Sequence, residues 1–258
     1  MTDAAPVRLL ATGASNLARM ALPLLAAARA GSRGPVEAHF VLGRGRSYGV
    51  GSNLLGRGLC GIRHAALWER LPTLPPADTT ALLLDVGNDL LYGFAPEGIL
   101  GWVDDVLQRL VAAAANRHVV GLPLAAIERL GPRRFVMVRS LLVPKSRLQH
   151  ADALAMSRTL HEGLRTLAAR HGATFHEPEL ACYGLDPVHV RRSLWTEVAH
   201  RWLGLEAAAR EPAPSVDGTL ARWRFLAAAP HERSWFGRTV QNAQPVRRWR
   251  DGSSLSLW

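Results

Sequence analysis

Two periodicities of apolar residues alternate along the chain. Short runs of four to seven mostly apolar residues, typical of buried strands, recur as far as residue 176. Between them lie longer segments in which apolar residues recur every three or four positions, as on one face of a helix. The pattern predicts strands at residues 7–13, 36–42, 80–86, 118–122 and 173–176, and helices at residues 16–30, 62–71, 96–117 and 151–170.

This order of elements predicts the α/β class. Five strands that alternate with helices imply a parallel sheet with helices on both faces. We therefore expect a three-layer αβα sandwich around a five-stranded parallel sheet. In such folds ligands bind beyond the carboxyl ends of the strands, so reactive side chains are to be sought directly after each predicted strand.

Length and pattern together limit the number of domains. With 258 residues, 48% of them hydrophobic, the chain can bury a sizeable core without disulfide bonds. The periodic pattern ends near residue 205, and the segment that follows is rich in arginine and tryptophan. We predict an α/β domain over residues 1–203 and a basic extension over residues 204–258 that packs on its core.

Positive charge is concentrated toward the C-terminus. The net charge is +10, almost entirely from arginine because Lys145 is the single lysine, and residues 190–258 hold eleven arginines against six acidic residues. Such a surface could bind an acidic partner or nucleic acid. Tryptophans beside arginines can stack on single-stranded nucleic acid, but more often they pin an extension to its core, so a nucleic-acid partner is not expected.

No targeting or membrane-spanning segment is expected. The apolar run at residue 7 follows only six residues, too few for the basic start of a secretory signal, and the chain holds no run of 18 apolar residues. We therefore expect a cytoplasmic protein in which Cys60 and Cys182 stay reduced. The histidines and cysteines show no metal-ligand spacing, so neither a metal nor a cofactor is expected.

Four polar residues near predicted strand ends could perform acyl transfer. Ser15 lies at the first strand-to-helix junction, where the N–H groups of a helix N-terminus favour an anionic oxygen. A serine nucleophile needs a base that is itself oriented by a third group, and His189 and Asp186 could supply both. Asn88, after the third strand, offers an amide donor to a developing oxyanion. Each residue alone also fits an ordinary role: Ser15 as a helix N-cap, Asn88 and Asp186 in turns, and His189 as a histidine at the start of a helix.

The chain order of these residues resembles the SGNH, or GDSL-type, hydrolase superfamily. Residues 13–16 read Gly-Ala-Ser-Asn, where the family has Gly-Asp-Ser followed by Leu or Asn. Residues 86–89 read Val-Gly-Asn-Asp, against Gly-x-Asn-Asp, and residues 186–189 read Asp-Pro-Val-His, against Asp-x-x-His. The resemblance covers residues 7–200 and implies the flavodoxin-like αβα fold of SGNH hydrolases.

The resemblance also implies a role for each candidate residue. Ser15 would be the nucleophile, His189 its general base, and Asp186 the group that orients the histidine. The oxyanion would be held by the Ser15 main-chain N–H, the Asn88 side-chain amide and the N–H of one glycine. The family needs no cofactor for this chemistry.

That glycine forms the family's second block. Gly61 is the candidate, because it opens the predicted helix ahead of the third strand, and Gly49 and Gly51 are alternatives. Two positions depart from the family pattern: Ala14 stands where aspartate is usual, and Val86 where glycine is usual. Neither change removes a side chain that takes part in acyl transfer.

Three arginines lie in the long glycine-rich stretch that should overhang the site. Arg44, Arg46 and Arg57 fall within residues 43–61. They could bind an anionic group on the substrate, or they could simply be solvated loop residues. We treat them as candidate substrate-binding residues.

The sequence therefore predicts a serine-dependent esterase or deacylase for a small-molecule or carbohydrate-type ester. A competing pattern, the Thr-Gly-Ala-Ser at residues 12–15, resembles the dinucleotide loop of short-chain dehydrogenases. Leu17 and Arg19 stand where that loop needs further glycines, so this interpretation is disfavoured. An acyltransferase on the same fold and an inactive binding protein for an acidic partner stay open as alternatives, as does the oligomeric state.

Overall fold

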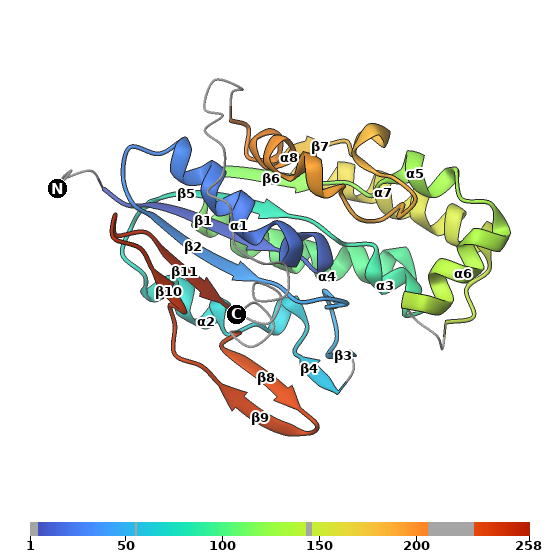
Figure 1. Ribbon diagram of the computed structural model, residues 1–258, viewed down its shortest axis with the longest axis horizontal. Helices are drawn as coiled ribbons and strands as arrows, with labels where there is room; N and C mark the ends of the chain where they lie inside the picture. Colours follow the sequence, from blue (N-terminus) through green and yellow to red (C-terminus); the bar gives the residue numbers. More distant parts are fainter. Residues whose placement is uncertain (1–4, 55, 143–145, 206–229) are drawn as a thin grey trace.

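The computed structural model describes residues 5–54, 56–142, 146–205 and 230–258. The strands of the main sheet are β1 (Val7–Thr12), β2 (Val36–Val41), β5 (Asp78–Leu83), β6 (Asn116–Val120), β7 (Thr174–His176), β10 (Arg247–Arg248) and β11 (Ser254–Leu257). In the described ranges they lie in the order β10-β11-β2-β1-β5-β6-β7 (Figure 1). Neighbouring strands run parallel except β10, which is antiparallel to β11.

Helices cover both faces of this sheet. The α-helices are α1 (Ser15–Ala30), α2 (Leu67–Arg70), α3 (Asn88–Leu91), α4 (Pro96–Ala113), α5 (Leu124–Glu128), α6 (Pro132–Leu142), α7 (His150–Arg170) and α8 (Trp195–Trp202). Short 3-10 turns lie at Ile62–His64, Leu71–Thr73, Leu180–Cys182 and Arg192–Leu194. Helices α1 and α8 pack on one face of the sheet, and α4 and α7 on the other.

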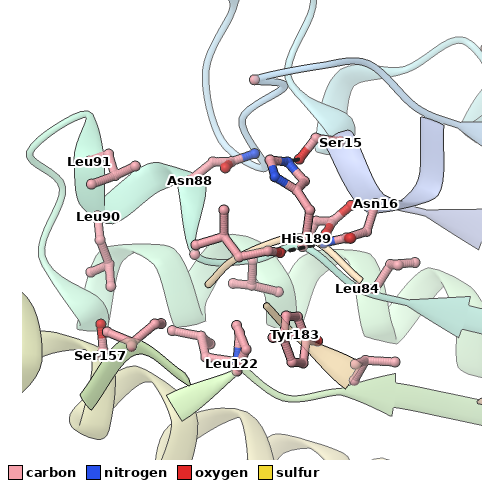
Figure 2. Close-up of a pocket in the computed structure, with 18 of the residues that line it drawn as sticks. Ser15, Asn16, Leu84, Asn88, Leu90, Leu91, Leu122, Ser157, Tyr183 and His189 are labelled. Atoms are coloured by element: carbon pink, nitrogen blue, oxygen red, sulfur yellow. Dashed lines mark hydrogen bonds between the residues drawn. The ribbon is translucent and has the colours of Figure 1, made fainter. Parts of the chain in front are cut away.

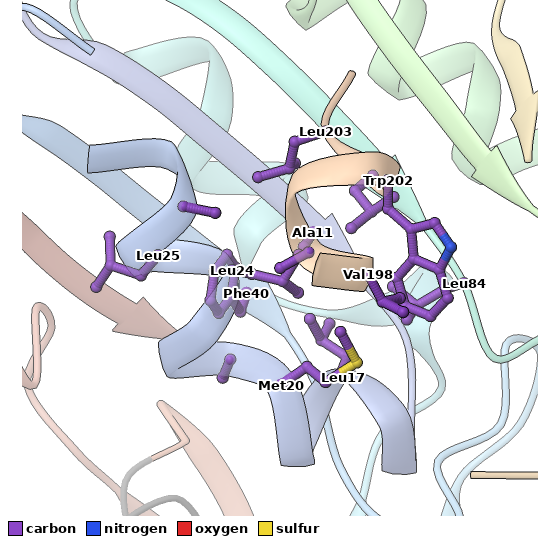
Figure 3. Packing of buried hydrophobic residues seen from close by; sticks show 14 of the residues in the cluster. Ala11, Leu17, Met20, Leu24, Leu25, Phe40, Leu84, Val198, Trp202 and Leu203 are labelled. Atoms are coloured by element: carbon purple, nitrogen blue, oxygen red, sulfur yellow. The ribbon is translucent and has the colours of Figure 1, made fainter. Parts of the chain in front are cut away.

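The two faces follow from the alternation of side chains along each strand. Leu9 and Ala11 of β1 belong to the cluster with α1 and α8, whereas Leu10 belongs to the cluster with α4 and α7. Figure 3 shows the first cluster, in which Met20 of α1 and Trp202 of α8 lie close to the strand residues. Because both faces of β1 are buried, this strand reads in the sequence as a mostly apolar run.

The predicted fold class is confirmed, with changes at its margins. The five predicted strands are present, as are the predicted first, third and fourth helices. The predicted helix at residues 62–71 is instead divided into a 3-10 turn, the four-residue helix α2 and a second 3-10 turn. The predicted helix at residues 96–117 ends at Ala113, because the chain turns there into β6.

The C-terminal residues add strands that the sequence pattern did not indicate. β11 extends the main sheet beside β2, and β10 pairs with β11 at its edge. A second, antiparallel sheet has the order β3-β4-β8-β9 and joins β3 (Ser52–Leu54) and β4 (Arg57–Leu59) to the hairpin β8 (Glu232–Trp235) and β9 (Arg238–Gln241). Residues 206–229 of the predicted extension lie outside the described residues, so the proposed division at residue 203 stays a prediction.

The position of β11 predicts that it belongs to the cooperative core. Leu257 is fully buried in the cluster with α1 and α8, so Leu257→Ala should lower the free energy of unfolding by about 2–5 kcal/mol in urea denaturation. Leu185→Ala, at a side chain that is 84% exposed, is the control and should change little. A Leu257→Ala protein as stable as the control variant would show that β11 contributes nothing to the folded core.

Candidate functional site

Three side chains from two distant segments form a hydrogen-bonded chain at the carboxyl edge of the sheet. Ser15 begins α1 directly after β1, and Asp186 and His189 lie in the loop after β7. The Ser15 hydroxyl is 2.8 Å from Nε2 of His189, and Nδ1 of His189 is 2.6 Å from Oδ2 of Asp186 (Figure 2 shows Ser15 and His189). The structure thus brings together the three residues that the sequence analysis selected as nucleophile, base and orienting group.

The partners of His189 determine which ring nitrogen carries the proton. An ionised carboxylate can only accept a hydrogen bond, so Nδ1 must donate to Asp186. In a neutral ring Nε2 is then the acceptor and takes the hydrogen bond from Ser15. Burial disfavours the charged form of Asp186, but its hydrogen bond to His189, the charge of that histidine, the Val188 N–H and the charge of Arg19 outweigh it and hold the pKa below its usual value.

Asp85, which the sequence analysis missed, organises the start of α1. Its Oδ2 accepts the main-chain N–H groups of Ala14 at 2.8 Å and Leu17 at 3.0 Å, on either side of Ser15. Asp85 has a φ of +65°, a conformation that is uncommon for residues other than glycine but is accessible to aspartate. A single charged residue in the apolar run at residues 80–86 was the available signal. A carboxylate at a helix N-terminus is favourable, so Asp85 stabilises the turn that carries Ser15.

Asn16 connects this turn to the loop of His189. Its amide nitrogen donates to Oδ1 of Asp85 at 2.8 Å and to the carbonyl of Val188 at 2.9 Å. Its amide oxygen accepts the N–H of Val190 at 3.0 Å. Both residues that flank His189 are therefore fixed by one buried side chain beside Ser15.

Asn88 presents an unused hydrogen-bond donor to the same place. Its side-chain amide nitrogen is buried and has no hydrogen-bond partner among the described residues. Figure 2 shows this nitrogen on the side of the amide that faces Ser15 and His189. An unsatisfied buried donor costs about 1–3 kcal/mol, so its presence indicates a position kept for a ligand atom.

A cavity of about 300 Å³ opens beside these residues. Ser15, Asn88 and His189 line it, together with Gly45, which follows β2 and has a φ of +65°. Gly45, which the sequence analysis did not consider, therefore lies beside Ser15 and Asn88, where the predicted second-block glycine was expected to act. The rule that ligands bind beyond strand ends would have favoured it, because it lies four residues after the end of β2.

Gly61 and its two alternatives are not among the residues that line this cavity. A Cβ atom on Gly61 would lie 2.8 Å from the main-chain carbon and oxygen of Gly49, and one on Gly49 would lie within 2.3 Å of the Trp102 ring. These two glycines thus permit close packing of the chain. Gly51 lines a separate, polar hollow next to β3 and β4.

Of the three predicted substrate-binding arginines, only Arg44 lines the cavity, where it is exposed and lies with Arg19. Arg46 is wrongly predicted, because its side chain is fully buried and donates to the main-chain oxygens of Leu42, Cys60 and Trp258. Burial lowers its pKa.

Arg57 does not line the cavity either. It lies in β4 of the second sheet, where burial, followed by the charges of Arg233, Arg46 and Arg44, lowers its pKa to about 10. The position of Arg57 does not support a role at the Ser15 site.

Asp89 holds the glycine-rich loop against the helix that carries Asn88. It is fully buried, and its Oδ2 accepts the N–H of Tyr48 at 2.9 Å. Burial raises its pKa to about 6, although hydrogen bonds from Ser47 and Tyr48 act in the opposite direction. The loop that contributes Gly45 is therefore tied to α3 by a carboxyl group that is easily protonated.

The described residues hold two cysteines outside the Ser15 site. Cys60 and Cys182 are free thiols, and Cys60 contacts the guanidinium of Arg46. No group of three or more His, Cys, Asp or Glu side chains in these ranges is arranged to hold a metal ion. Within the same ranges no helix is both long and apolar enough to cross a bilayer.

Comparison with solved structures identifies the architecture. The native aryl esterase of M. smegmatis superposes with a TM-score of 0.50 at 13% sequence identity, over 77% of this chain and 100% of that chain. The chain therefore shares the three-layer α/β fold of that esterase. The inhibitor-bound form of the same esterase matches the fold equally, with a TM-score of 0.50 at 15% identity over 77% and 100% of the two chains. No family model and no curated protein matches the sequence.

Arg44 and Arg46, two residues apart, provide a test of the structural role of Arg46. Arg46→Met should lower the free energy of unfolding by about 3 kcal/mol, because several buried main-chain oxygens lose their donor. Arg46→Lys should rescue little, since an ammonium group cannot form the same planar fork. Arg44→Met, at an exposed side chain, is the matched control and should stay near wild type in urea denaturation. Equal stabilities of Arg46→Met and Arg44→Met would contradict the structural role of Arg46.

The raised pKa of Asp89 predicts a specific pH dependence of stability. The folded state holds the Asp89 proton more tightly than the unfolded state, so this group lowers the free energy of unfolding as pH rises from 4 to 6. Asp89→Asn removes that effect and retains an oxygen for the Tyr48 N–H. The stability of Asp89→Asn relative to wild type should therefore increase between pH 4 and pH 7, by up to about 3 kcal/mol. A difference that is constant across this range in urea denaturation would contradict the raised pKa.

Proposed function

We propose that the protein is a serine-dependent hydrolase of carboxylic esters. The observation that carries this proposal is the continuous hydrogen-bonded chain from Asp186 through His189 to Ser15, at the edge of a cavity. A serine hydroxyl that donates to an oriented neutral histidine is the arrangement that makes a weak nucleophile reactive. The likeness to an aryl esterase fold is consistent with this activity but supports only the fold.

The first half of the reaction acylates Ser15. Its oxygen attacks the ester carbonyl carbon while its proton passes to Nε2 of His189, and the Asp186 carboxylate stabilises the imidazolium that forms. The tetrahedral intermediate collapses as the carbon–oxygen bond to the alcohol breaks, and the histidine returns the proton to that alcohol. Water then repeats the sequence on the acyl-enzyme, so the products are a carboxylic acid and an alcohol and Ser15 is restored.

Three donors are proposed for the negative oxygen of the intermediate. The first is the buried amide nitrogen of Asn88, which lacks another partner among the described residues. The second is the main-chain N–H of Ser15, at the start of α1. The third is the main-chain N–H of Gly45, in place of Gly61, because Gly45 lines the cavity. Donors that are fixed before the reaction stabilise the developing charge without further reorganisation.

Arg44 and Arg19 are proposed to face the leaving group. Both line the cavity, and Arg19 lies 3.8 Å from the Asp186 carboxylate, which is half exposed. Two cations at this rim would favour an alcohol that carries an anionic group. The substrate is then a small ester whose leaving alcohol stays near solvent.

Steady-state kinetics on p-nitrophenyl acetate test the proposed roles. Ser15→Ala should lower kcat at least about 1000-fold, and Asn88→Ala should lower kcat about 100- to 1000-fold with little change in KM, because the amide acts on the transition state. Asn53→Ala, in β3, removes an amide of the same kind that is not part of the cavity and should retain wild-type kinetics. A folded Ser15→Ala protein with wild-type turnover would rule out the proposed nucleophile.

A further inference from the structure

The cavity beside Ser15 continues far beyond the reacting groups. Its remaining walls are almost entirely apolar, and they come from the ends of β5 and β6 and from α5, α6 and α7. Figure 1 shows α5 and α6 beyond the carboxyl ends of the strands, next to α7. The side chains farther along the wall include Leu122, Ile127, Leu130, Phe135, Leu148 and Ala153.

Figure 2 shows the direction in which the cavity extends. Leu90, Leu122 and Ser157 lie on the side away from Ser15, and Asn88 lies between the two ends. Helix α6 turns Phe135 inward, where it is buried, whereas the next residue, Val136, is 46% exposed. The far wall of the cavity is therefore a layer of packed side chains. A ligand that enters this part of the cavity is removed from water.

The position of the leaving group fixes which part of an ester occupies this space. His189 must protonate the alcohol, and its partner Asp186 is half exposed and lies beside Arg19 at the rim. The alcohol therefore leaves on the solvent side. With the carbonyl carbon at Ser15 and its oxygen at Asn88, the remaining substituent, the acyl chain, points into the apolar part of the cavity.

Two polar side chains lie in the apolar part of the cavity. Nη1 of Arg139 donates to the carbonyl of Leu148 at 2.8 Å, whereas its buried Nε has no hydrogen-bond partner among the described residues. Ser157 contributes a single hydroxyl on the buried face of α7. If the acyl part of the ester carried a carbohydrate, it would need several hydrogen-bond donors and acceptors here, whereas a hydrocarbon chain needs none.

We propose that this cavity binds the hydrocarbon chain of a medium-length acyl group, so that the enzyme prefers octanoyl esters to acetyl esters. This inference rests on the proposed function, because it assumes that the ester carbonyl is held at Ser15. Ala153, on the wall contributed by α7, is a determinant of chain length. Each methylene that enters such an apolar site raises affinity for the transition state about threefold to fourfold.

The first test compares esters on the wild-type protein. The value of kcat/KM should rise at least about tenfold from p-nitrophenyl acetate to p-nitrophenyl octanoate, because six further methylenes leave water. Equal values, or a decline along the acetate, butyrate and octanoate series, would overturn the inference while leaving the ester hydrolase intact.

The second test fills the cavity. Ala153→Phe should reduce the ratio of kcat/KM for the octanoate ester to kcat/KM for the acetate ester at least about tenfold, and circular dichroism should show that the variant is folded. Ala155→Phe, two residues along the same helix on its exposed face, is the matched control and should change neither ester. Equal losses for both esters in a folded Ala153→Phe protein, or no loss for either, would contradict the assignment of the wall.

A binding experiment separates this inference from the proposed function. Octanoate should bind to Ser15→Ala protein in titration calorimetry, and acetate should bind far more weakly. One outcome would contradict the proposed acyl site and leave the proposed hydrolase activity intact. In that outcome the wild type hydrolyses the acetate ester, but octanoate does not bind and the octanoate ester is not hydrolysed. If octanoate binds but no ester is hydrolysed, the proposed function fails and the apolar site stands.

Discussion

The carboxylate of Asp85 joins the chain segments on which the site depends. It extends from the end of β5, accepts N–H groups on both sides of Ser15, and binds the amide of Asn16. Asn16 in turn fixes both neighbours of His189. Hydrogen bonds to a charged acceptor are roughly twice as strong as those between neutral groups, so this network can hold the nucleophile and its base in a fixed relation.

The same network accounts for one departure from the family pattern. Ala14 stands where the SGNH family usually has aspartate, yet a carboxylate still lies at this turn, because Asp85 supplies it from the neighbouring strand. The loss of the side chain at residue 14 therefore does not leave the start of α1 without an anionic partner. No comparable observation explains Val86, which simply lines the cavity.

Local patterns predicted the central fold and several of the residues that the structure brings together at the candidate site, and non-local contacts account for what they missed. Strand β1, the alternating β2 and the end of β5 fall in segments whose apolar periodicity is typical of strands, and the helices that alternate with the strands indicate the parallel order. β11 and the β4–β8 pairing join segments that are far apart in the sequence, so no local signal marks them. Ser15, Asp186 and His189 were found because each follows a strand in a recognisable order.

Arg46 and Gly61 show where sequence reasoning fails. Arginine in a glycine-rich loop normally faces solvent. Nothing in the neighbouring residues indicates that Arg46 is buried and donates to the main-chain oxygens of Leu42, Cys60 and Trp258. The stretch at residues 43–61 offers several glycines, and only the folded chain shows that Gly45 lines the cavity while Gly61 packs against Gly49. The roles of both residues depend on burial, and burial depends on contacts between segments that are far apart in the sequence.

The central claim is that the oriented histidine makes Ser15 a nucleophile. It is tested most directly by intact-protein and peptide mass spectrometry after incubation with a fluorophosphonate, which reacts with activated serine hydroxyls. The account predicts one adduct per chain, located on Ser15, and loss of that adduct in His189→Ala protein that remains folded. Folded wild-type protein that stays unlabelled, or that is labelled at another serine, would contradict it.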